Sequence, residues 1–385
     1  MARNHGKTRP RMVLTLVGIG ALATLLWCTR RPDSPHTVTP RAASSLPPSV
    51  PALTSATPQQ PLVAGSPWDS RHACESLVAT GHRLPRPGRS PRLATWNLRW
   101  FPYGRLPGRS VQPATDIAWV ACIVTWLDVD AIALQEIVLD TTGRAAMGDL
   151  VRRLDQATAS TWVARFDDCG GRGRQHVGLL VDSKNVAISH EAPVAPLNPA
   201  QGACEQNLRP GYGAFLQWPD GPGLFLVSVH LDSGTSHRDF VHRQTSISRI
   251  PRAVEDLLAR FRDPDIVLAG DLNTMGCDVR GGCDPPVSAD QELAAIDALL
   301  QNNSGFRRVA LDLPCTEYYR GKGHALDHFL VSPSVAANHP DASARVQGSC
   351  ASTRCAQEHE STAAATFLSD HCPVVLDLGQ TLSAR

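Results

Sequence analysis

Polar residues of the types used for metal binding and proton transfer recur at the ends of short apolar runs. They are Asn97 after LATW, Gln135 and Glu136 after DAIAL, His230 at the end of LFLVSV, Asp271 and Asn273 after IVLAG, Asp327 and His328 at the start of a run, and Asp370 and His371 before CPVVL. A single Asp after a strand is usually a turn residue, and a single His is usually a satisfied hydrogen-bonding group. Recurrence over six runs favours a polar cleft at one sheet edge.

This set of side chains has a consistent chemistry. Carboxylate oxygens without thiolates suit a hard cation such as Mg²⁺ or Mn²⁺. Two histidines near carboxylates suit proton transfer near neutral pH, and Asn with Arg supplies hydrogen-bond donors for a phosphoryl group. Together these residue types indicate metal-assisted cleavage of a phosphoester.

Strand-like and helix-like segments alternate from residue 93 onward, as in an α/β fold. Short apolar runs predict strands at residues 93–96, 129–134, 176–181, 224–230, 266–269, 328–331 and 373–376. Helical spacing predicts helices at residues 115–128, with Thr115 as the N-cap, at 145–154, and at 240–261 with a break at Pro251.

Length and composition restrict the class of protein. With 385 residues, 42% hydrophobic and 19% charged, the chain is long enough for one large α/β domain or two average ones, and a disordered tail or polytopic membrane protein is excluded. Net charge is +1, but the first 70 residues carry seven basic and two acidic residues, so the remainder is slightly acidic. A phosphate-bearing substrate would therefore have to be attracted by local Arg groups or a metal.

The amino-terminal region predicts export or membrane attachment. A basic stretch to Arg11 precedes the apolar run at residues 12–28, which indicates a signal peptide or a signal anchor. Bulky Trp27 before Cys28 disfavours lipidation of that cysteine. Residues 29–88 are rich in Pro, Ser and Ala and predict a linker, or a disordered stretch without a spacer role, ahead of a folded domain at 89–380.

Eleven cysteines without a Cys-x-x-Cys pair indicate an oxidising compartment. We therefore expect an extracytoplasmic protein that is secreted, periplasmic or anchored through its amino-terminal segment. Cys277 with Cys283, and Cys350 with Cys355, are close enough in sequence to form disulfides that close small loops. Cys122 and Cys372 lie in apolar segments and are expected to be ordinary core residues.

The order of motifs resembles that of the endonuclease/exonuclease/phosphatase superfamily, whose fold is DNase I-like. The matching segments are TWNLRW, ALQE, SVHLDSG, AGDLN, ALDHFLVS and SDHCPV, and they span roughly residues 90–378. The resemblance implies a four-layered α/β sandwich, in which two mixed β-sheets pack together and helices flank them.

The resemblance also implies roles for the residues of these motifs. Glu136 should ligate the divalent metal, Mg²⁺ or Mn²⁺, and Asn97 and Asp370 should help to hold or orient it. Asp271 should position and deprotonate the attacking water, and Asn273 should bind the scissile phosphate. A structural Ca²⁺ is a further candidate ion.

The remaining roles concern the two histidines. By resemblance, Asp327 should pair with His371, and His230 should donate to the phosphate or the leaving oxygen. Arg99, two residues after the motif asparagine Asn97, is typical of the DNase I-like nucleases and is expected, like Asn97, to contact phosphate. DNase I has a Glu before the strand that begins near residue 176, whereas this chain has RGRQH there, so the partner of His230 is open.

Three other polar clusters lie outside these motifs. They are Arg172 with Arg174, the group His237, Arg238, His242 and Arg243, and the run Glu358, His359 and Glu360. Arg172 and Arg174 could bind substrate phosphate or belong to a solvated loop, and the sequence does not favour either interpretation. The second is expected to be the polar face of a helix. The third is expected in a solvated loop, because three adjacent residues cannot share one helical face.

These observations predict a divalent-metal-dependent phosphodiesterase outside the cytoplasm, in first place a monomeric endonuclease acting on DNA. One alternative keeps the chemistry and changes the substrate to a phospholipid, as in sphingomyelinases, or an inositol phosphate. Another is a non-catalytic binding module on the same fold. Membrane contact is expected only if the amino-terminal segment is retained. Substrate, disulfide pairing and signal cleavage remain open at this stage.

Overall fold

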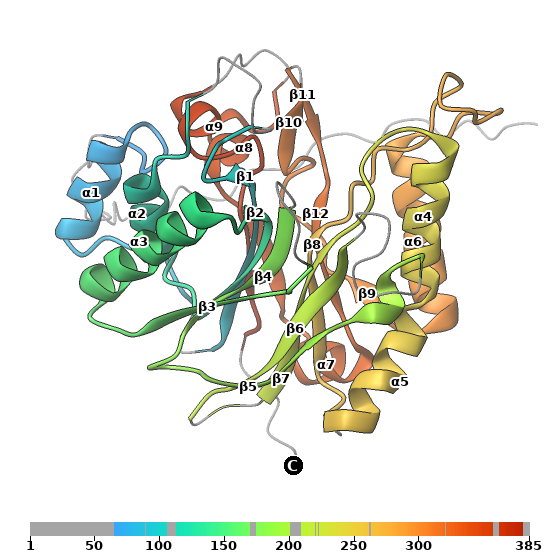
Figure 1. Cartoon of the computed structure of the whole chain (residues 1–385), viewed down its shortest axis with the longest axis horizontal. Helices are drawn as coiled ribbons and strands as arrows, with labels where there is room; N and C mark the ends of the chain where they lie inside the picture. The colour runs from blue at the N-terminus through green and yellow to red at the C-terminus, as the bar shows by residue number, and fades with distance from the viewer. Residues whose placement is uncertain are drawn as a thin grey trace, which may run out of the picture. The chain divides into compact units, whose positions relative to one another are not determined.

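Two six-stranded mixed β-sheets pack face to face in the computed structural model (Figure 1). The first sheet has the order β13 (Ser343–Val346), β14 (Val374–Asp377), β1 (Arg92–Phe101), β2 (Ala131–Val138), β4 (Gln175–Asp182) and β3 (Trp162–Phe166). The second has the order β5 (Ala187–Pro193), β6 (Arg209–Gln217), β7 (Gly223–His230), β8 (Ile266–Asp271), β12 (Asp327–Val331) and β9 (Arg307–Arg308). A separate hairpin consists of β10 (Glu317–Tyr319) and β11 (Lys322–His324).

The structure describes residues 65–88, 90–105, 113–169, 175–200, 209–219, 221, 223–261, 263–319, 321–356 and 362–379. The chain divides into two units, Met1–Gln60 and Pro61–Arg385, and every described residue belongs to the second. The predicted signal segment, the pair Arg172 and Arg174, and the run Glu358 to Glu360 lie outside the described residues. Among the helices of the described part, none is long and apolar enough to cross a membrane.

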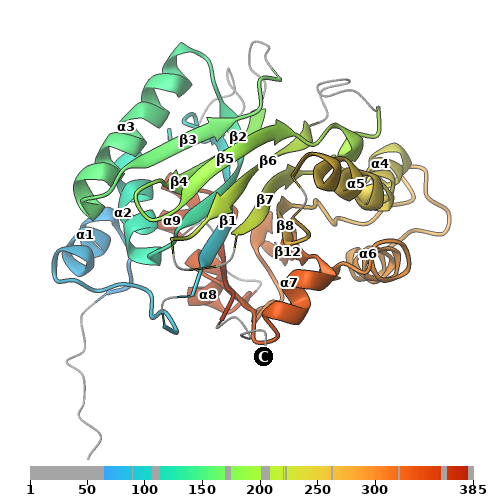
Figure 2. The ribbon, with the colours of Figure 1, turned by 90° about the horizontal axis from the view of Figure 1, so that it is seen from below.

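Helices cover the outer face of each sheet (Figures 1 and 2). The first sheet is covered by α1 (Arg71–Ala79), α2 (Ile117–Leu127) and α3 (Thr141–Thr158), and the second by α4 (His237–Ser248), α5 (Ile250–Phe261) and α6 (Ala289–Asn303). The shorter helices are η1 (Ala195–Leu197), α7 (Pro333–Asn338), α8 (Gly348–Thr353) and α9 (Ala363–Phe367). The layers are therefore helix, sheet, sheet and helix, which confirms the DNase I-like sandwich expected from the sequence.

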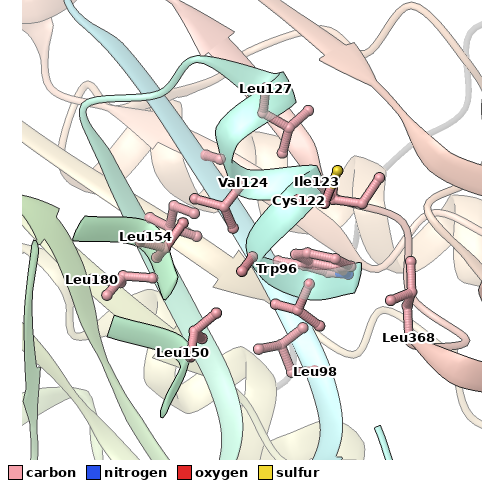
Figure 3. Packing of buried hydrophobic residues seen from close by; sticks show 14 of the residues in the cluster. Trp96, Leu98, Cys122, Ile123, Val124, Leu127, Leu150, Leu154, Leu180 and Leu368 are labelled. Atoms are coloured by element: carbon pink, nitrogen blue, oxygen red, sulfur yellow. The ribbon is translucent and has the colours of Figure 1, made fainter. Parts of the chain in front are cut away.

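Alternation along β1 shows how the sequence creates these layers. Leu93 packs between the two sheets, whereas Ala94, Trp96 and Leu98 face the helices, because successive strand side chains point to opposite faces. Figure 3 shows Trp96 and Leu98 beside the apolar side chains of α2 and α3. Burying an aliphatic or aromatic side chain of this kind stabilises the fold by about 1.5–3 kcal/mol.

Each strand and helix expected from apolar periodicity overlaps an element of the structure, although many of the boundaries differ, and two of the differences concern specific residues. The N-cap of α2 is Asp116, whose carboxylate accepts a hydrogen bond from the backbone N–H of Trp119, so the prediction of Thr115 is wrong by one residue. The helix break expected at Pro251 falls at Arg249, and Pro251 lies in the first turn of α5. A proline is tolerated there because the first N–H groups of a helix have no intrahelical acceptor.

The expected linker at residues 29–88 extends too far. Residues 65–88 include α1, and the side chains of Trp68 and Leu84 are buried in the core beneath α2. The helix begins at Ser70, whose hydroxyl accepts a hydrogen bond from the backbone N–H of Ala73. The folded body therefore includes residues that composition alone assigned to the linker.

Four disulfides lie within the described residues, linking Cys74 to Cys122, Cys277 to Cys283, Cys315 to Cys355, and Cys350 to Cys372. The short loop closed by Cys277 and Cys283 is confirmed. The predicted pair of Cys350 and Cys355 is wrong, because each sulfur is bonded across the fold to another segment. Cys122 and Cys372 are therefore disulfide-bonded and not free core thiols.

Candidate active site

Strand register brings the motif residues to one end of the two sheets. Parallel pairing of β1 with β2 places Asn97 beside the residue that precedes Glu136. In the second sheet, His230 at the end of β7 is paired with Asp271 at the end of β8, and Asp271 is paired with Asp327 at the start of β12. Backbone pairing thus makes the motif residues neighbours within each sheet, and the packing of the two sheets brings the two groups together.

Asn97 connects the two sheets. Its Nδ2 donates to Glu136 Oε1 at 3.1 Å and to Asp271 Oδ2 at 3.0 Å, while its Oδ1 accepts from the backbone N–H of Arg99 at 2.9 Å. The side chain is fully buried. Asn97 was expected either to hold a metal or to orient the metal ligands. The geometry favours orientation, because the amide oxygen of Asn97 already accepts a hydrogen bond from the backbone N–H of Arg99.

Glu136 occupies an irregular position in β2. Its φ is +61°, and the pairing of β2 with β4 shifts register between Leu134 and Ile137, as at a β-bulge. The carboxylate accepts from Asn97 Nδ2, from the backbone N–H of Trp100 at 3.0 Å, and from Gln175 Nε2. A left-handed non-glycine residue is strained, so these three donors fix a carboxylate that an ordinary strand would aim elsewhere.

Asp271 lies at the centre of the site. Its Oδ1 accepts from the backbone N–H of Asn273 at 2.8 Å, and its Oδ2 lies 3.4 Å from His230 Nε2 and 3.9 Å from His371 Nε2. Burial raises the pKa of Asp271 to about 7, although the nearby His371 opposes this rise. A carboxylate with a pKa near neutrality is suited to act as a general base.

Asp327 and His371 form the expected pair. His371 Nδ1 lies 2.8 Å from Asp327 Oδ2, and both side chains are largely buried. Burial alone would lower the pKa of His371, but the charge and hydrogen bond of Asp327, together with the charges of Asp271 and Asp370, raise it well above its ordinary value. The imidazolium form of His371 is therefore favoured at neutral pH.

His230 faces two carboxylates of the site. Its Nε2 faces Asp271 at 3.4 Å and Glu136 at 3.9 Å. Gln175, which stands where DNase I-like sequences were expected to supply a carboxylate, donates instead to Glu136. The next residue, His176, pairs with buried Asp167 at 2.8 Å.

Two expected phosphate contacts are engaged within the protein. Arg99 is largely buried, donates to the carbonyl of Thr366 at 3.2 Å, and lies 3.7 Å from Asp370. Asn273 has a φ of +50° and donates through Nδ2 to the carbonyl of Leu231 at 3.0 Å. Both side chains thus contact neighbouring segments of the protein, and their expected contact with phosphate stays a prediction.

The donor chemistry of the site fits a hard divalent cation. Ligand atoms of Asp271, Asp327 and His371 lie within 4.8 Å of one another. This trio contains the hydrogen-bonded pair of Asp327 with a histidine that favours its charged form, and imidazolium cannot ligate a metal. The oxygens of Glu136 and of the partly exposed Asp370 are the better candidates, because carboxylate oxygens are the preferred ligands of Mg²⁺ and Mn²⁺.

Several residues at the site escaped the sequence analysis. Glu317 is buried, and burial raises its pKa to about 8 against the opposing effect of His371. Thr316 Oγ1 accepts from the backbone N–H of Asp327 at 2.9 Å. Ser369 Oγ donates to the carbonyl of Asn97 at 2.7 Å. Glu317 and Thr316 follow no apolar run, so periodicity gave no signal for them, whereas Ser369 belongs to the motif SDHCPV but was given no role.

The polar group on α4 is only partly a solvated helix face. Arg243 is fully buried, which contradicts the expectation for this residue, and its guanidinium is paired with buried Glu292 at 2.7 and 2.9 Å. It also donates to the carbonyls of Asp232, Gly234 and Gly276. These carbonyls belong to the loops that follow β7 and β8, so Arg243 ties together the two loops that leave the site.

Comparison with known proteins gives matches among solved structures only. No family model matches the chain, and no curated protein matches it. Similar structures include the 3′-5′ exonuclease NExo of Neisseria meningitidis, with 18% identity, a TM-score of 0.46, and coverage of 75% of this chain and 99% of that one. They also include an endonuclease/exonuclease/phosphatase of Bacteroides vulgatus, with 13% identity, a TM-score of 0.46, and 75% and 98% coverage. TDP2 of D. rerio, complexed with single-strand DNA product, has 14% identity, a TM-score of 0.45, and 75% and 98% coverage.

Proposed function

We propose that this protein is a divalent-metal-dependent phosphodiesterase, in first place a nuclease, that acts outside the cytoplasm. One observation carries the proposal: Asn97 bridges Glu136 of the first sheet and Asp271 of the second, and His371 lies 3.9 Å from the same Asp271 carboxylate. A carboxylate suited to metal binding, a candidate base and an imidazolium therefore converge on one place, as phosphoester hydrolysis requires.

Glu136 and Asp370 would hold the divalent cation, and Asn97 would orient the Glu136 carboxylate. When bound, the cation supplies positive charge that neutralises the phosphoryl oxygens during displacement. The three hydrogen bonds that the Glu136 carboxylate accepts keep it in place before substrate arrives. Such preorganisation avoids the cost of reorienting a ligand during the reaction.

Asp271 is the proposed general base for the attacking water. The donors Asn97 Nδ2 and the Asn273 backbone N–H fix both of its oxygens, and its pKa of about 7 matches proton abstraction at neutral pH. Deprotonating the water at this carboxylate produces the nucleophile that attacks phosphorus.

His371 and His230 are the proposed groups on the phosphate and the leaving oxygen. Asp327 fixes the tautomer of His371 and supports its positive charge, so the imidazolium stabilises negative charge as it develops on the phosphoryl group. His230, held against Asp271 and Glu136, is placed to donate to the same group.

The proposed location rests on two features. The basic and apolar segment at the start of the chain resembles an export signal. All nine cysteines among the described residues are disulfide-bonded, which supports an oxidising compartment. We propose a monomer that is secreted, periplasmic or retained at a membrane by its amino-terminal segment.

A lipid or inositol-phosphate hydrolase is the second candidate, favoured by the apolar segment at residues 12–28, which would bring the site to a membrane surface. The metal site and the base would be the same in both enzymes, so substrate alone distinguishes them. A non-catalytic binding module is disfavoured, because a binding role does not require the acid, amide and histidine set to converge.

Activity of the full-length protein, produced under oxidising conditions, tests the proposal. Plasmid DNA, RNA, sphingomyelin vesicles and phosphatidylinositol vesicles are offered with Mg²⁺, Mn²⁺ or EDTA. We expect EDTA-sensitive cleavage of at least one substrate, with losses of about 10²-fold or more in Glu136→Gln, Asp271→Asn and His371→Ala. Glu255→Gln on the outer helix α5 is the matched control. Cleavage that survives metal removal would contradict the mechanism.

A further inference from the structure

Glu317 is a buried carboxyl group at the site that the proposed mechanism does not use. It lies on β10, and two backbone hydrogen bonds place it opposite His371, from Cys372 N to Thr316 O at 2.7 Å and from Tyr318 N to Asp370 O at 3.0 Å. Bonds that flank a pair in this way define a non-hydrogen-bonded antiparallel pair, in which the side chains share one face and the Cα atoms are about 4.5 Å apart. The carboxyl group of Glu317 therefore stands beside the imidazole of His371.

The Glu317 carboxyl group lacks a full set of partners. The residue is only 5% exposed, and its Oε2 has no hydrogen-bond partner among the described residues. An unsatisfied buried polar group is costly, and in native proteins such groups commonly mark a site where a ligand supplies the missing contact. The charged groups that face it are His371, Asp370, Asp271 and Asp327.

The chemistry of a bound phosphodiester limits what that contact can be. A phosphodiester carries no hydrogen on its oxygens at neutral pH, so the phosphate itself offers no donor to a carboxyl acceptor. A sugar hydroxyl of the alcohol attached to the phosphate can supply such a donor. A carboxyl oxygen accepts a hydrogen bond in either ionisation state.

We propose that Glu317 contacts the substrate by accepting a hydrogen bond from a sugar hydroxyl next to the scissile phosphate, so that the site prefers a ribonucleotide strand. This inference rests on the proposed nuclease function and deepens it. It departs from the DNA preference that the motif resemblance implies, because deoxyribose lacks the 2′-hydroxyl that would satisfy Glu317. Glu317 is thus a specificity-determining residue.

Matched RNA and DNA strands of one sequence test the contact in the full-length protein with Mg²⁺. We expect kcat/KM for RNA to exceed that for DNA about tenfold, the effect of one hydrogen bond to a buried carboxyl. Glu317→Met, which removes the acceptor at similar length, should lower the RNA-to-DNA ratio of kcat/KM about tenfold. Glu317→Gln keeps an acceptor oxygen and should retain the preference. A 2′-fluoro strand, which has no hydrogen to donate, should behave like DNA.

The outcomes separate this inference from the proposed function. Equal cleavage of RNA and DNA by the wild type, or an RNA-to-DNA ratio that Glu317→Met does not change, overturns the role of Glu317 and leaves the nuclease intact. Cleavage of inositol lipid without RNA also overturns it. Absence of any cleavage refutes the proposed function, and strand affinities measured in EDTA by fluorescence anisotropy then test the contact directly. An RNA preference in binding that Glu317→Met abolishes supports it, and equal affinities overturn it.

Discussion

Replacing Arg243 by Met should destabilise the fold strongly, although Arg243 contacts neither substrate nor metal in the proposed mechanism. The side chain is fully buried and donates hydrogen bonds to both oxygens of Glu292 and to three loop carbonyls, those of Asp232, Gly234 and Gly276. Substitution leaves a buried carboxylate without its cation and three carbonyls without their donor. Water reaches these buried groups less easily than it reaches a surface ion pair, so it cannot fully replace the lost hydrogen bonds.

The expected loss is about 3–5 kcal/mol of unfolding free energy, the cost of removing one partner of a buried ion pair. This is a large fraction of the roughly 5–15 kcal/mol typical of a folded domain. Arg243→Lys should cost less than Met but should not be neutral, because an ammonium group cannot reproduce a guanidinium that donates in five directions. The double variant Arg243→Met with Glu292→Met should be more stable than Arg243→Met alone.

Urea unfolding followed by tryptophan fluorescence, with disulfides intact, measures these differences. Arg252→Met on α5 is the matched control, because this arginine is exposed, and it should change stability by no more than about 0.5 kcal/mol. We also expect kcat/KM to fall in Arg243→Met, since both loops held by Arg243 begin beside the site. A loss below about 1 kcal/mol, or a double variant less stable than the single one, would refute the reasoning.

Three further predictions concern the site and its surroundings. Asp327→Asn removes the charge that raises the pKa of His371, so the alkaline limb of the pH–rate profile should move to lower pH, and an unchanged limb would exclude the proposed imidazolium. Removing the disulfide between Cys350 and Cys372 by double serine substitution should lower the unfolding free energy by about 3 kcal/mol and reduce activity, because Cys372 follows His371. Calorimetry measures the first effect and the substrate assay the second. Full activity would show that the disulfide does not order the site. Burial lowers the pKa of His328 to about 4, so between pH 6.5 and 4 the unfolded chain binds the proton first. The unfolding free energy should therefore fall as the pH is lowered, by up to about 1.4 kcal/mol per pH unit from this group. Urea unfolding at pH 7, 5 and 4 should show a weaker pH dependence for His328→Gln than for the wild type. Identical pH dependences would contradict the assignment.

The sequence was most informative where a polar residue ends a buried strand. His230, Asp271 and Asp327 stand out because the apolar runs beside them must be strands, and the end of a strand is an edge where side chains meet. The order of the motifs also indicated the four layers. What periodicity could not supply was the strand order, since pairing of β1 with both β2 and β14 joins segments distant in the chain.

Residues outside apolar runs were missed or misjudged for a physical reason. Glu317 belongs to a three-residue strand, which is too short for any periodic pattern. Arg243 looked like a surface charge because helix α4 is polar, and only its distant partner Glu292 makes burial possible. Cys350 and Cys355 are five residues apart, yet their sulfurs are bonded to Cys372 and Cys315. Each error concerns a long-range contact that local spacing does not encode.

The pairing of β14 with β1 has a consequence for the biosynthesis of the protein. Strand β1 remains at an open sheet edge until β14, which follows it at a great distance in the sequence, is made and pairs with it. His371 lies just ahead of β14, so a ribosome-bound or prematurely terminated chain lacks both the imidazole and the closing strand. Under the proposed mechanism, hydrolysis therefore requires that synthesis has passed β14, so a chain released before this strand would be inactive.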